Sequence, residues 1–481
     1  MSAKPHHPST LCHAALATGI VLACAVVVAC NETTSPTGES LTICQMMGPT
    51  GMMVNIRESQ LEEHLARGDY VTSLSVSKGS TSGDGIHFSR ITDALAAARA
   101  GRMSRGETTI SACRITITVA AGTYTGSVSA TSGSDVEVLP LTIDVPDITL
   151  LGAFQMPLND KGRPTGNAGA PGAPVTTITA NPGLVSIKTG NALDKYAEPL
   201  IVINAHPNGP RGDGAIIQGF VLQSGNPEDA VVGGNAVWAM RARGIVVQGN
   251  QIEGGFSEPV EMRSAVGRVE RNLLIGKGGS CSICMFGPGD YRVIANRQVG
   301  LSTGRLGVLI FPTIFTAVPP NVEQLVLPSE ALVTATVTNN ELRNHQEVPF
   351  GIGVRVAAIG PGAPDVVGMA NVIAENNDLS DNRWGFVVEG GFVVANTAQR
   401  GSTNVTLRGN TLARSCQAGV LIALNSQGNA IAASPGPTVK NSSFTIDLGQ
   451  DINWADTWYS HPSGSGSTLM VDGKPVENGK R

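Results

Sequence analysis

The stretch NVTLRGNTLARS, residues 404–415, carries the pattern that decides the fold. Val405, Leu407, Asn410 and Leu412 form V-x-L-x-x-N-x-L, in which alternating apolar residues are interrupted by one asparagine. Variants of this pattern recur upstream, around Asn250, Asn272, Asn296, Asn340 and Asn377. Successive asparagines are 22, 24, 44, 37 and 33 residues apart. Self-similarity of this kind indicates a solenoid whose shortest coils have ~22–24 residues and whose longer coils carry insertions.

Two solenoids have this repeat length, and the segments between the asparagines distinguish them. A leucine-rich repeat needs a helical or turn-rich return segment in every coil. Here each asparagine is instead followed by a second apolar segment, often led by glycine, such as GVLIF at 307–311, GVRVA at 353–357 and GFVVE at 385–389. The sequence therefore predicts an all-β parallel β-helix with two β segments per coil.

The repeated asparagine has a structural interpretation. It stands where the chain bends between strands, and asparagine tolerates the left-handed backbone conformation that a bend requires. Its amide can also bond a backbone group or the asparagine of the next coil. We expect the six asparagines to build the coils and to take no part in catalysis.

An N-terminal cap is predicted before the first coil. Ile91, Ala94, Leu95 and Ala98 form an apolar stripe at helical spacing, within the stretch GSTSGDGIHFSRITDALAAARAG at 79–101. Ser89 is the expected N-cap, Asp93 suits the positive end of the helix, and Gly101 can end it. A helix at about 89–100 would cover the open edge of the first coil.

With this helix and the following ITVAAGTYTG at 117–126, the chain resembles the pectin-lyase-like superfamily of right-handed parallel β-helices. The opening is similar to extracellular β-helix proteins of the DUF1565-like kind. In the polysaccharide lyases and hydrolases of this superfamily, the active site lies on the outer face of the sheets and is built from charged side chains on consecutive coils. The resemblance therefore implies an outer sheet face as the place to look for chemistry.

Strand alternation assigns the two sides of the glycine-led segments. Val237, Val260, Ile283, Val308, Val354, Phe386 and Val420 share the inward phase with the residues two places further on. The outward positions then carry only four charges, Glu261, Arg263, Arg355 and Glu389, and these are the candidate catalytic residues. Trp238, also outward, is the candidate for stacking on a sugar.

This outward face favours a non-catalytic protein. No two carboxylates occupy adjacent coils in these rows, and the lyase and hydrolase motifs of the superfamily do not match. A Ca²⁺ site needs about six oxygen ligands, so Ca²⁺ is unsupported, and we expect no cofactor. Cys281-Ser-Ile-Cys284 has no second Cys/His pair, so we expect no metal. The expected function is carbohydrate binding or a structural role, and the alternative is a polysaccharide lyase or glycoside hydrolase.

The N-terminus predicts export. An apolar run ends at Cys30 and is too short to span a bilayer, and the polar NETTSPTGES follows it. Val27-Val28-Ala29-Cys30 resembles a bacterial lipobox, which implies lipidation of Cys30. The residue after Cys30 is Asn31 and not the Asp that would retain a lipoprotein in the inner membrane of many Gram-negative bacteria, so the resemblance implies the outer membrane. Plain secretion is the alternative. The membrane, through the lipid anchor, and a polysaccharide are the expected partners. Nucleic acid is not expected, because the formal net charge is −5.

These observations divide the chain into four parts. We expect a lipoprotein signal peptide at 1–29, a polar tether and linker at 30–69, the parallel β-helix at 70–450 and a C-terminal cap or tail at 451–481. Five cysteines, Cys44, Cys113, Cys281, Cys284 and Cys416, remain beyond Cys30. An odd number is no disulfide framework, although a bridge can form in an oxidising compartment.

Overall fold

The structure is a computed structural model of residues 1–481. The residues that it describes are 40–47, 50–80, 84–103, 113–127, 130, 135–166, 172–180, 199–204, 212–224, 234–276, 281–299, 306–312, 330–346, 351–357, 367–389, 400–412, 418–423, 443–447, 457–460, 468–471 and 473–475. Cys30, Cys416 and the apolar run at the N-terminus lie outside these residues. None of the described helices is both long enough and apolar enough to cross a membrane.

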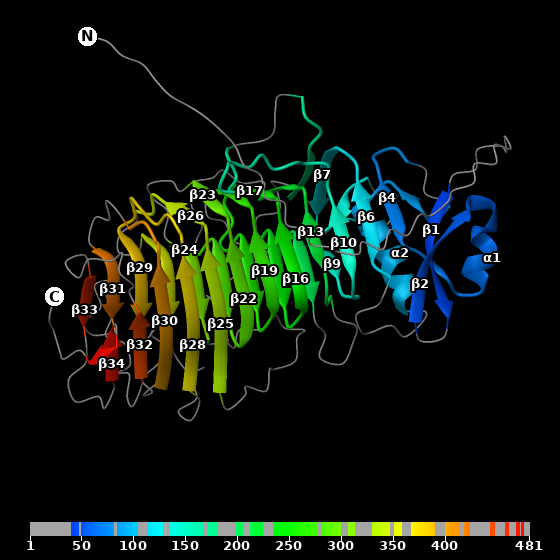
Figure 1. The fold of residues 1–481 in the computed structure, drawn as a ribbon. Coiled ribbons are helices and arrows are strands. Elements are labelled where there is room, and N and C mark those ends of the chain that lie inside the picture. The colour runs from blue at the N-terminus through cyan, green and yellow to red at the C-terminus, as the bar shows by residue number, and fades with distance from the viewer. Residues whose placement is uncertain are drawn as a thin grey trace, which may run out of the picture. The chain divides into compact units, whose positions relative to one another are not determined.

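Apart from a small antiparallel sheet near the N-terminus, the described strands stack into three sheets of almost entirely parallel strands, called sheets B, C and D (Figure 1). Sheet B contains, in spatial order, β5 (His87–Phe88), β4 (Ser73–Val76), β6 (Ile115–Val119), β10 (Ile148–Leu151), β13 (Ile216–Gln218), β16 (Arg243–Gln248), β19 (Val266–Glu270), β22 (Gly289–Ile294), β25 (Glu330–Thr338), β28 (Val367–Glu375), β30 (Arg400–Arg408), β32 (Ser443–Asp447), β34 (Thr468–Val471) and β35 (Lys474–Pro475).

Sheets C and D complete each coil. Sheet C contains β8 (Glu137–Val138), β7 (Gly122–Ser127), β11 (Thr176–Ala180), β14 (Val221–Gln223), β17 (Gln251–Glu253), β20 (Leu273–Ile275), β23 (Arg297–Val299) and β26 (Glu341–Arg343). Sheet D contains β9 (Leu141–Ile143), β12 (Ile201–Asn204), β15 (Val237–Met240), β18 (Val260–Arg263), β21 (Ile283–Phe286), β24 (Leu306–Phe311), β27 (Ile352–Ala357), β29 (Trp384–Glu389), β31 (Ala418–Ala423) and β33 (Thr457–Ser460).

The fold is therefore a right-handed parallel β-helix, as the sequence predicts. The expected two β segments per coil are wrong, because a short strand of sheet C lies between the strands of sheets B and D. The missing strand is the tripeptide that follows the repeated asparagines from Asn250 to Asn340, for example Gln251–Glu253 after Asn250. Three residues are too few to show a period of two. The sequence pattern therefore indicated a turn where this short strand lies.

The predicted inward rows of sheet D are confirmed. Val237, Val260, Ile283, Val308 and Val354 are register partners on successive strands, and each is completely buried. Phe386 continues the row and is buried, and Val420 pairs with it. The inward positions of sheet B, such as Val247, Val269 and Val293, fill the same core.

The repeated asparagines form a continuous ladder at the corner between sheets B and C. The Nδ2 of Asn272 donates to Oδ1 of Asn296 at 3.0 Å, and the Nδ2 of Asn296 donates to Oδ1 of Asn340 at 3.0 Å. The expected bonding between asparagines is thus confirmed from Asn250 to Asn410. The expected left-handed conformation belongs to the preceding residue instead, as at Arg271, Ala295, Asn339 and Asn376.

The N-terminal helix caps the coil stack, but its two ends differ from the predicted ends. Helix α2 spans Ile91–Met103 and buries the predicted stripe of Ile91, Ala94, Leu95 and Ala98. Ser89 is not its N-cap; the backbone N–H groups of Ile91 and Thr92 donate to the carboxylate of Glu137, at 2.8 and 2.9 Å. The helix also continues through Gly101. A distant carboxylate replaces the local cap, which no sequence spacing reveals.

The expected tether at 30–69 is wrong from residue 40 onward. Strands β1 (Ser40–Met47), β2 (Thr50–Arg57) and β3 (Tyr70–Val71) form the antiparallel sheet A, with a 3-10 turn at Glu58–Gln60 and helix α1 (Leu61–Ala66). A disulfide joins Cys44 of β1 to Cys113, just before β6. At the other end, β33 and β34 follow residue 450 and still pair in sheets D and B.

Candidate functional site

The outward face of sheet D holds the predicted site residues, and most of them are buried. Glu261 has no exposed surface, and Arg263, Arg355 and Trp238 are 5%, 4% and 8% exposed. Glu389 ends β29, and its side chain lies outside the described part of the structure. The predicted site residues whose side chains the structure describes are therefore closed to a large ligand on this face.

Glu261 and Arg263 form a buried ion pair. The Arg263 Nε donates to Oε1 of Glu261, and Nδ2 of Asn235 donates to Oε2 at 3.0 Å. The Arg263 guanidinium lies over Trp238 and Phe286, with 6.0 and 5.5 Å from Cζ to the ring centroids. Trp238 packs in an apolar cluster with Val202 and Met240. Glu261 and Arg263, predicted as catalytic residues, and Trp238, predicted to stack on a sugar, therefore pack inside the protein.

Glu261 and Arg355, by contrast, are not brought together. In the register of sheet D, Glu261 aligns with Cys284, then Leu309, then Arg355. Two coils therefore separate Glu261 from Arg355, a separation of about 14 Å at the spacing of neighbouring strands. Cys284 forms a disulfide with Cys281. The described residues contain no cluster of His, Cys, Asp and Glu suited to a metal ion.

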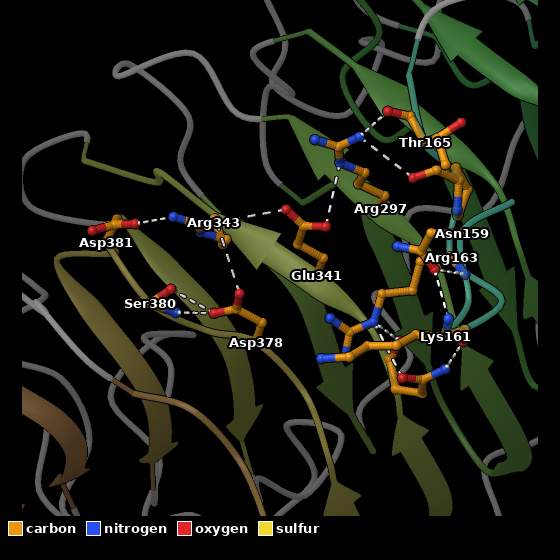
Figure 2. A network of polar contacts seen from close by, with 12 residues as sticks. Asn159, Lys161, Arg163, Thr165, Arg297, Glu341, Arg343, Asp378, Ser380 and Asp381 are labelled. Atoms are coloured by element: carbon orange, nitrogen blue, oxygen red, sulfur yellow. Dashed lines mark hydrogen bonds and ion pairs between the residues drawn. The ribbon is translucent and has the colours of Figure 1, made fainter.

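Sheet C carries a second set of charges that the sequence analysis missed. Arg297, Glu341 and Asp378 occupy the position directly after the ladder asparagine on three successive coils, and they are register partners. Arg343, two residues after Glu341, and Asp381 complete what we call the ion cluster (Figure 2). Its members are partly exposed. The signal was the residue directly after the repeated asparagine, which is Arg, Glu and Asp in these three coils when they are aligned.

Arg343 joins the carboxylates of the ion cluster. Its Nη1 lies 3.7 Å from Oε1 of Glu341 and 3.8 Å from Oδ2 of Asp378, and its Nη2 donates to Oδ2 of Asp381 at 2.5 Å. The hydrogen bond that Arg343 donates to Asp381 raises the pKa of Arg343. Asp378 also accepts from the backbone N–H of Ser380 at 3.1 Å. Glu341 and Asp378 thus stand on adjacent coils, and both are bridged by one cation.

A loop after β10, residues 152–166, lies against the ion cluster, and we call it the strap. The Arg163 Nε donates to the carbonyl of Asn339 at 2.7 Å, and its Nη2 donates to the carbonyl of Asn376 at 2.9 Å. These acceptors are the left-handed residues of two successive coils. Arg297 donates to the carbonyl of Thr165 at 2.5 Å (Figure 2).

The strap brings a further cation to the carboxylates. Burial lowers the pKa of Arg163, and the charges of Glu341 and Asp378 oppose this shift. The carboxylates therefore face arginines on both sides. This arrangement can hold the strap in place and can bond hydroxyl groups, whereas a general acid or base would first have to leave its arginine partner.

Comparison with known proteins adds similarity in fold only. The A-module of mannuronan C-5 epimerase AlgE6 from Azotobacter vinelandii is 13% identical over 80% of this chain and 94% of the module, with a TM-score of 0.34. An exopolygalacturonase from Thermotoga maritima is 11% identical over 79% and 88%, with a TM-score of 0.40. The catalytic domain of a GH87 α-1,3-glucanase is 10% identical over 83% and 68%, with a TM-score of 0.34.

The sequence identities to these structures are too low to show more than a similar fold. No protein-family model matches the sequence, and no curated protein matches it either. We therefore carry no catalytic residue from any of these proteins to this chain, and the site is judged on its own geometry.

Proposed function

We propose that the chain is an extracytoplasmic, non-catalytic β-helix protein that binds a polysaccharide and is anchored to the outer membrane through a lipid on Cys30. The observation that carries the non-catalytic part is the burial of Glu261, Arg263 and Arg355 on the outward face of sheet D. A substrate cannot reach a completely buried carboxylate. Two partly exposed carboxylates of sheet C, Glu341 and Asp378, share the cation of Arg343.

Polar side chains aligned along the stack support a polysaccharide as the ligand. On sheet B, Thr334, Asn371 and Asn404 are register partners on successive strands, and all three are exposed. Neighbouring coils are ~4.8 Å apart, so a chain of sugars lying along the stack would meet a hydrogen-bonding side chain at every coil. The disulfide between Cys44 and Cys113 supports an oxidising compartment outside the cytoplasm.

A screen of uronate and neutral polysaccharides tests this proposal. Binding is followed by retardation of the protein in gels containing each polysaccharide, and the same mixtures are assayed for unsaturated products and for new reducing ends. We expect retardation by at least one polysaccharide and no product. Product formation that is lost in Glu261→Ala and Arg355→Ala would overturn the non-catalytic proposal.

The second candidate function is a glycoside hydrolase or polysaccharide lyase acting at the ion cluster. One observation favours it: Glu341 and Asp378 stand on adjacent coils, and hydrolases on many folds use a pair of carboxylates. New reducing ends that disappear in both Glu341→Gln and Asp378→Asn, and persist in the exposed control Glu62→Gln, would establish it.

Lipidation is tested separately. Cells labelled with a fatty acid should incorporate it into the wild-type protein and not into Cys30→Ser. Incorporation into Cys30→Ser, or none into the wild type, would contradict the anchor and leave plain secretion.

A further inference from the structure

Arginine side chains gather on the outward face of sheet B over three consecutive strands, β16, β19 and β22. The inward positions of these strands are apolar and buried, as at Ile245, Val269 and Val293. The outward side and the adjoining turn carry four exposed arginines, which we call the arginine strip: Arg243, Arg268, Arg271 and Arg292. Figure 1 shows these strands side by side in the stack.

The strip places like charges on adjacent coils. Arg268 and Arg292 are direct register partners, so their Cα atoms are ~4.8 Å apart. Like charges directly opposite each other on a sheet are destabilising. Arg268 has Glu270 at 3.5 Å, but its side chain remains 47% exposed. Within the described part of the chain, the guanidinium groups of Arg243, Arg271 and Arg292 make no hydrogen bond or ion pair.

The strip is a local excess of positive charge in an acidic chain. The exposed or partly exposed carboxylates on these strands are Glu270 and Asp290, which leaves two positive charges in surplus where the whole chain carries −5. The ion cluster of sheet C is the opposite case, because Arg297 and Arg343 each have a carboxylate partner. The cations of sheet B therefore remain available to an external anion.

The rows that contain the strip continue mainly as uncharged polar residues, although the row of Arg292 also contains the exposed Ile373. Arg292 aligns with Thr336 of β25, and Asp290 aligns with Thr334, which is followed by Asn371 and Asn404. Guanidinium groups bind carboxylates through two parallel N–H bonds, while hydroxyl and amide groups suit sugar hydroxyls. Along the stack the face thus offers anion-binding groups first and hydroxyl-binding groups next.

We propose that the arginine strip binds a carboxylate-bearing polysaccharide that lies along the coil stack, with its carboxylates on Arg268 and Arg292 and its hydroxyls on the polar residues beyond. This inference rests on the proposed function and adds the site and the charge of the ligand. A polysaccharide fits better than an anionic membrane, because the face continues as a flat row of hydrogen-bonding side chains.

The test measures the affinity of the full-length protein for polygalacturonate and for dextran of matched length by isothermal titration calorimetry. The Arg268→Gln/Arg292→Gln double variant should raise the Kd for polygalacturonate about tenfold, because it removes both cations that pair with the carboxylates of the ligand. Arg408→Gln is the matched control, an exposed arginine of the same sheet on β30. Lysine at both strip positions should restore part of the affinity, and added salt should weaken binding.

The outcomes separate the two levels of the proposal. Equal affinity for dextran and polygalacturonate keeps polysaccharide binding and overturns the anionic ligand. No binding to either, or to any polysaccharide of the screen, overturns the proposed function itself. Unchanged affinity in the double variant, or an equal loss in Arg408→Gln, overturns the strip as the site. Strip-dependent binding to phosphatidylglycerol vesicles with none to polygalacturonate assigns the strip to a membrane surface and overturns the proposal.

Discussion

Each ladder asparagine satisfies polar groups of two coils at once. Asn296 accepts from the backbone N–H and the Nδ2 of Asn272, both at 3.0 Å, and donates to Oδ1 of Asn340 and to the carbonyl of Val269. It has no exposed surface. Buried backbone groups at a corner need partners, and a side chain that both accepts and donates supplies them at each coil.

Asn296→Ala should therefore lower the free energy of unfolding by about 3 kcal/mol, because it leaves buried donors and acceptors without partners. Urea unfolding followed by circular dichroism measures this change. Asn404→Ala, at an exposed outward position of β30, is the control and should change stability by less than ~0.5 kcal/mol. Similar losses in the two variants would contradict the role of the ladder.

His345 is a buried residue whose titration affects stability. Its Nδ1 lies 2.8 Å from Oδ1 of Asn382, and no described residue bonds its Nε2. Burial lowers its pKa from 6.5 to about 4. The folded protein keeps the ring neutral, so between these values the unfolded chain binds a proton that the folded chain does not. Stability contributed by His345 is present above pH ~6.5 and is lost as the pH falls to about 4.

His345→Gln should reduce the acid sensitivity of the protein by on the order of 3 kcal/mol. The measurement is the difference in unfolding free energy between pH 7 and pH 4, compared in the variant and the wild type. His87→Gln, a partly exposed histidine, should not reduce this difference. An unchanged difference in His345→Gln would show that other groups cause the acid sensitivity.

At the scale of elements, the strap is held to the coil corners by few but charged contacts. Arg163 bonds carbonyls of two successive coils, and Asn339 donates to the carbonyl of Lys161 at 2.6 Å. Gly152 and Gly219 allow the approach, since a Cβ on Gly152 would lie 2.2 Å from the carbonyl oxygen of Gly219. Loss of Arg163 should therefore release the tip of the strap and leave its base in place.

Arg163→Ala should speed cleavage after Lys161 by a lysine-specific protease about tenfold, which corresponds to ~1.4 kcal/mol of local opening free energy. Mass spectrometry of the first fragments identifies the cleaved bond. Thr165→Ala keeps the backbone carbonyl that Arg297 bonds, so it serves as the control. Equal cleavage rates in wild type and Arg163→Ala would show that the strap is held by other contacts.

The elements that the sequence predicts well are those set by side-chain alternation. The inward rows of sheet D follow from a period of two, and helix α2 follows from its stripe. The elements that it misses depend on partners far along the chain. Glu137 lies 46 residues from the helix terminus that it caps, and Arg163 lies 213 residues from Asn376. The accessible charges of sheet C could have been found by aligning coils, whereas the burial of Glu261 depends on what packs over the outward face.

At the scale of the whole molecule, the described coil stack has a helix at its first coils and an antiparallel strand at the far end of sheet B. Helix α2 packs at the first strands, and the antiparallel β35, with Pro475, ends sheet B at the other end. Covering helices and short terminal strands hide the unpaired backbone N–H and C=O groups of edge strands. Proline has no backbone N–H and cannot donate a hydrogen bond to a further strand. The sequence predicts the cap at the start because it contains a complete helix, while a two-residue strand at the end has no readable pattern.

The disulfide between Cys44 and Cys113 ties sheet A to the coil stack across 69 residues. In the chain-entropy model a loop of that length contributes about 4 kcal/mol, whereas the three-residue separation of Cys281 and Cys284 contributes about 2. Cys44→Ala/Cys113→Ala should therefore lower the thermal midpoint more than Cys281→Ala/Cys284→Ala. Hydrogen exchange locates the effect: the amide of Ile43 in β1 should lose protection in the first variant and keep it in the second. An equal or larger loss of stability in the second variant would show that burial of the short bridge, rather than closure of the long loop, determines the contribution of the disulfides.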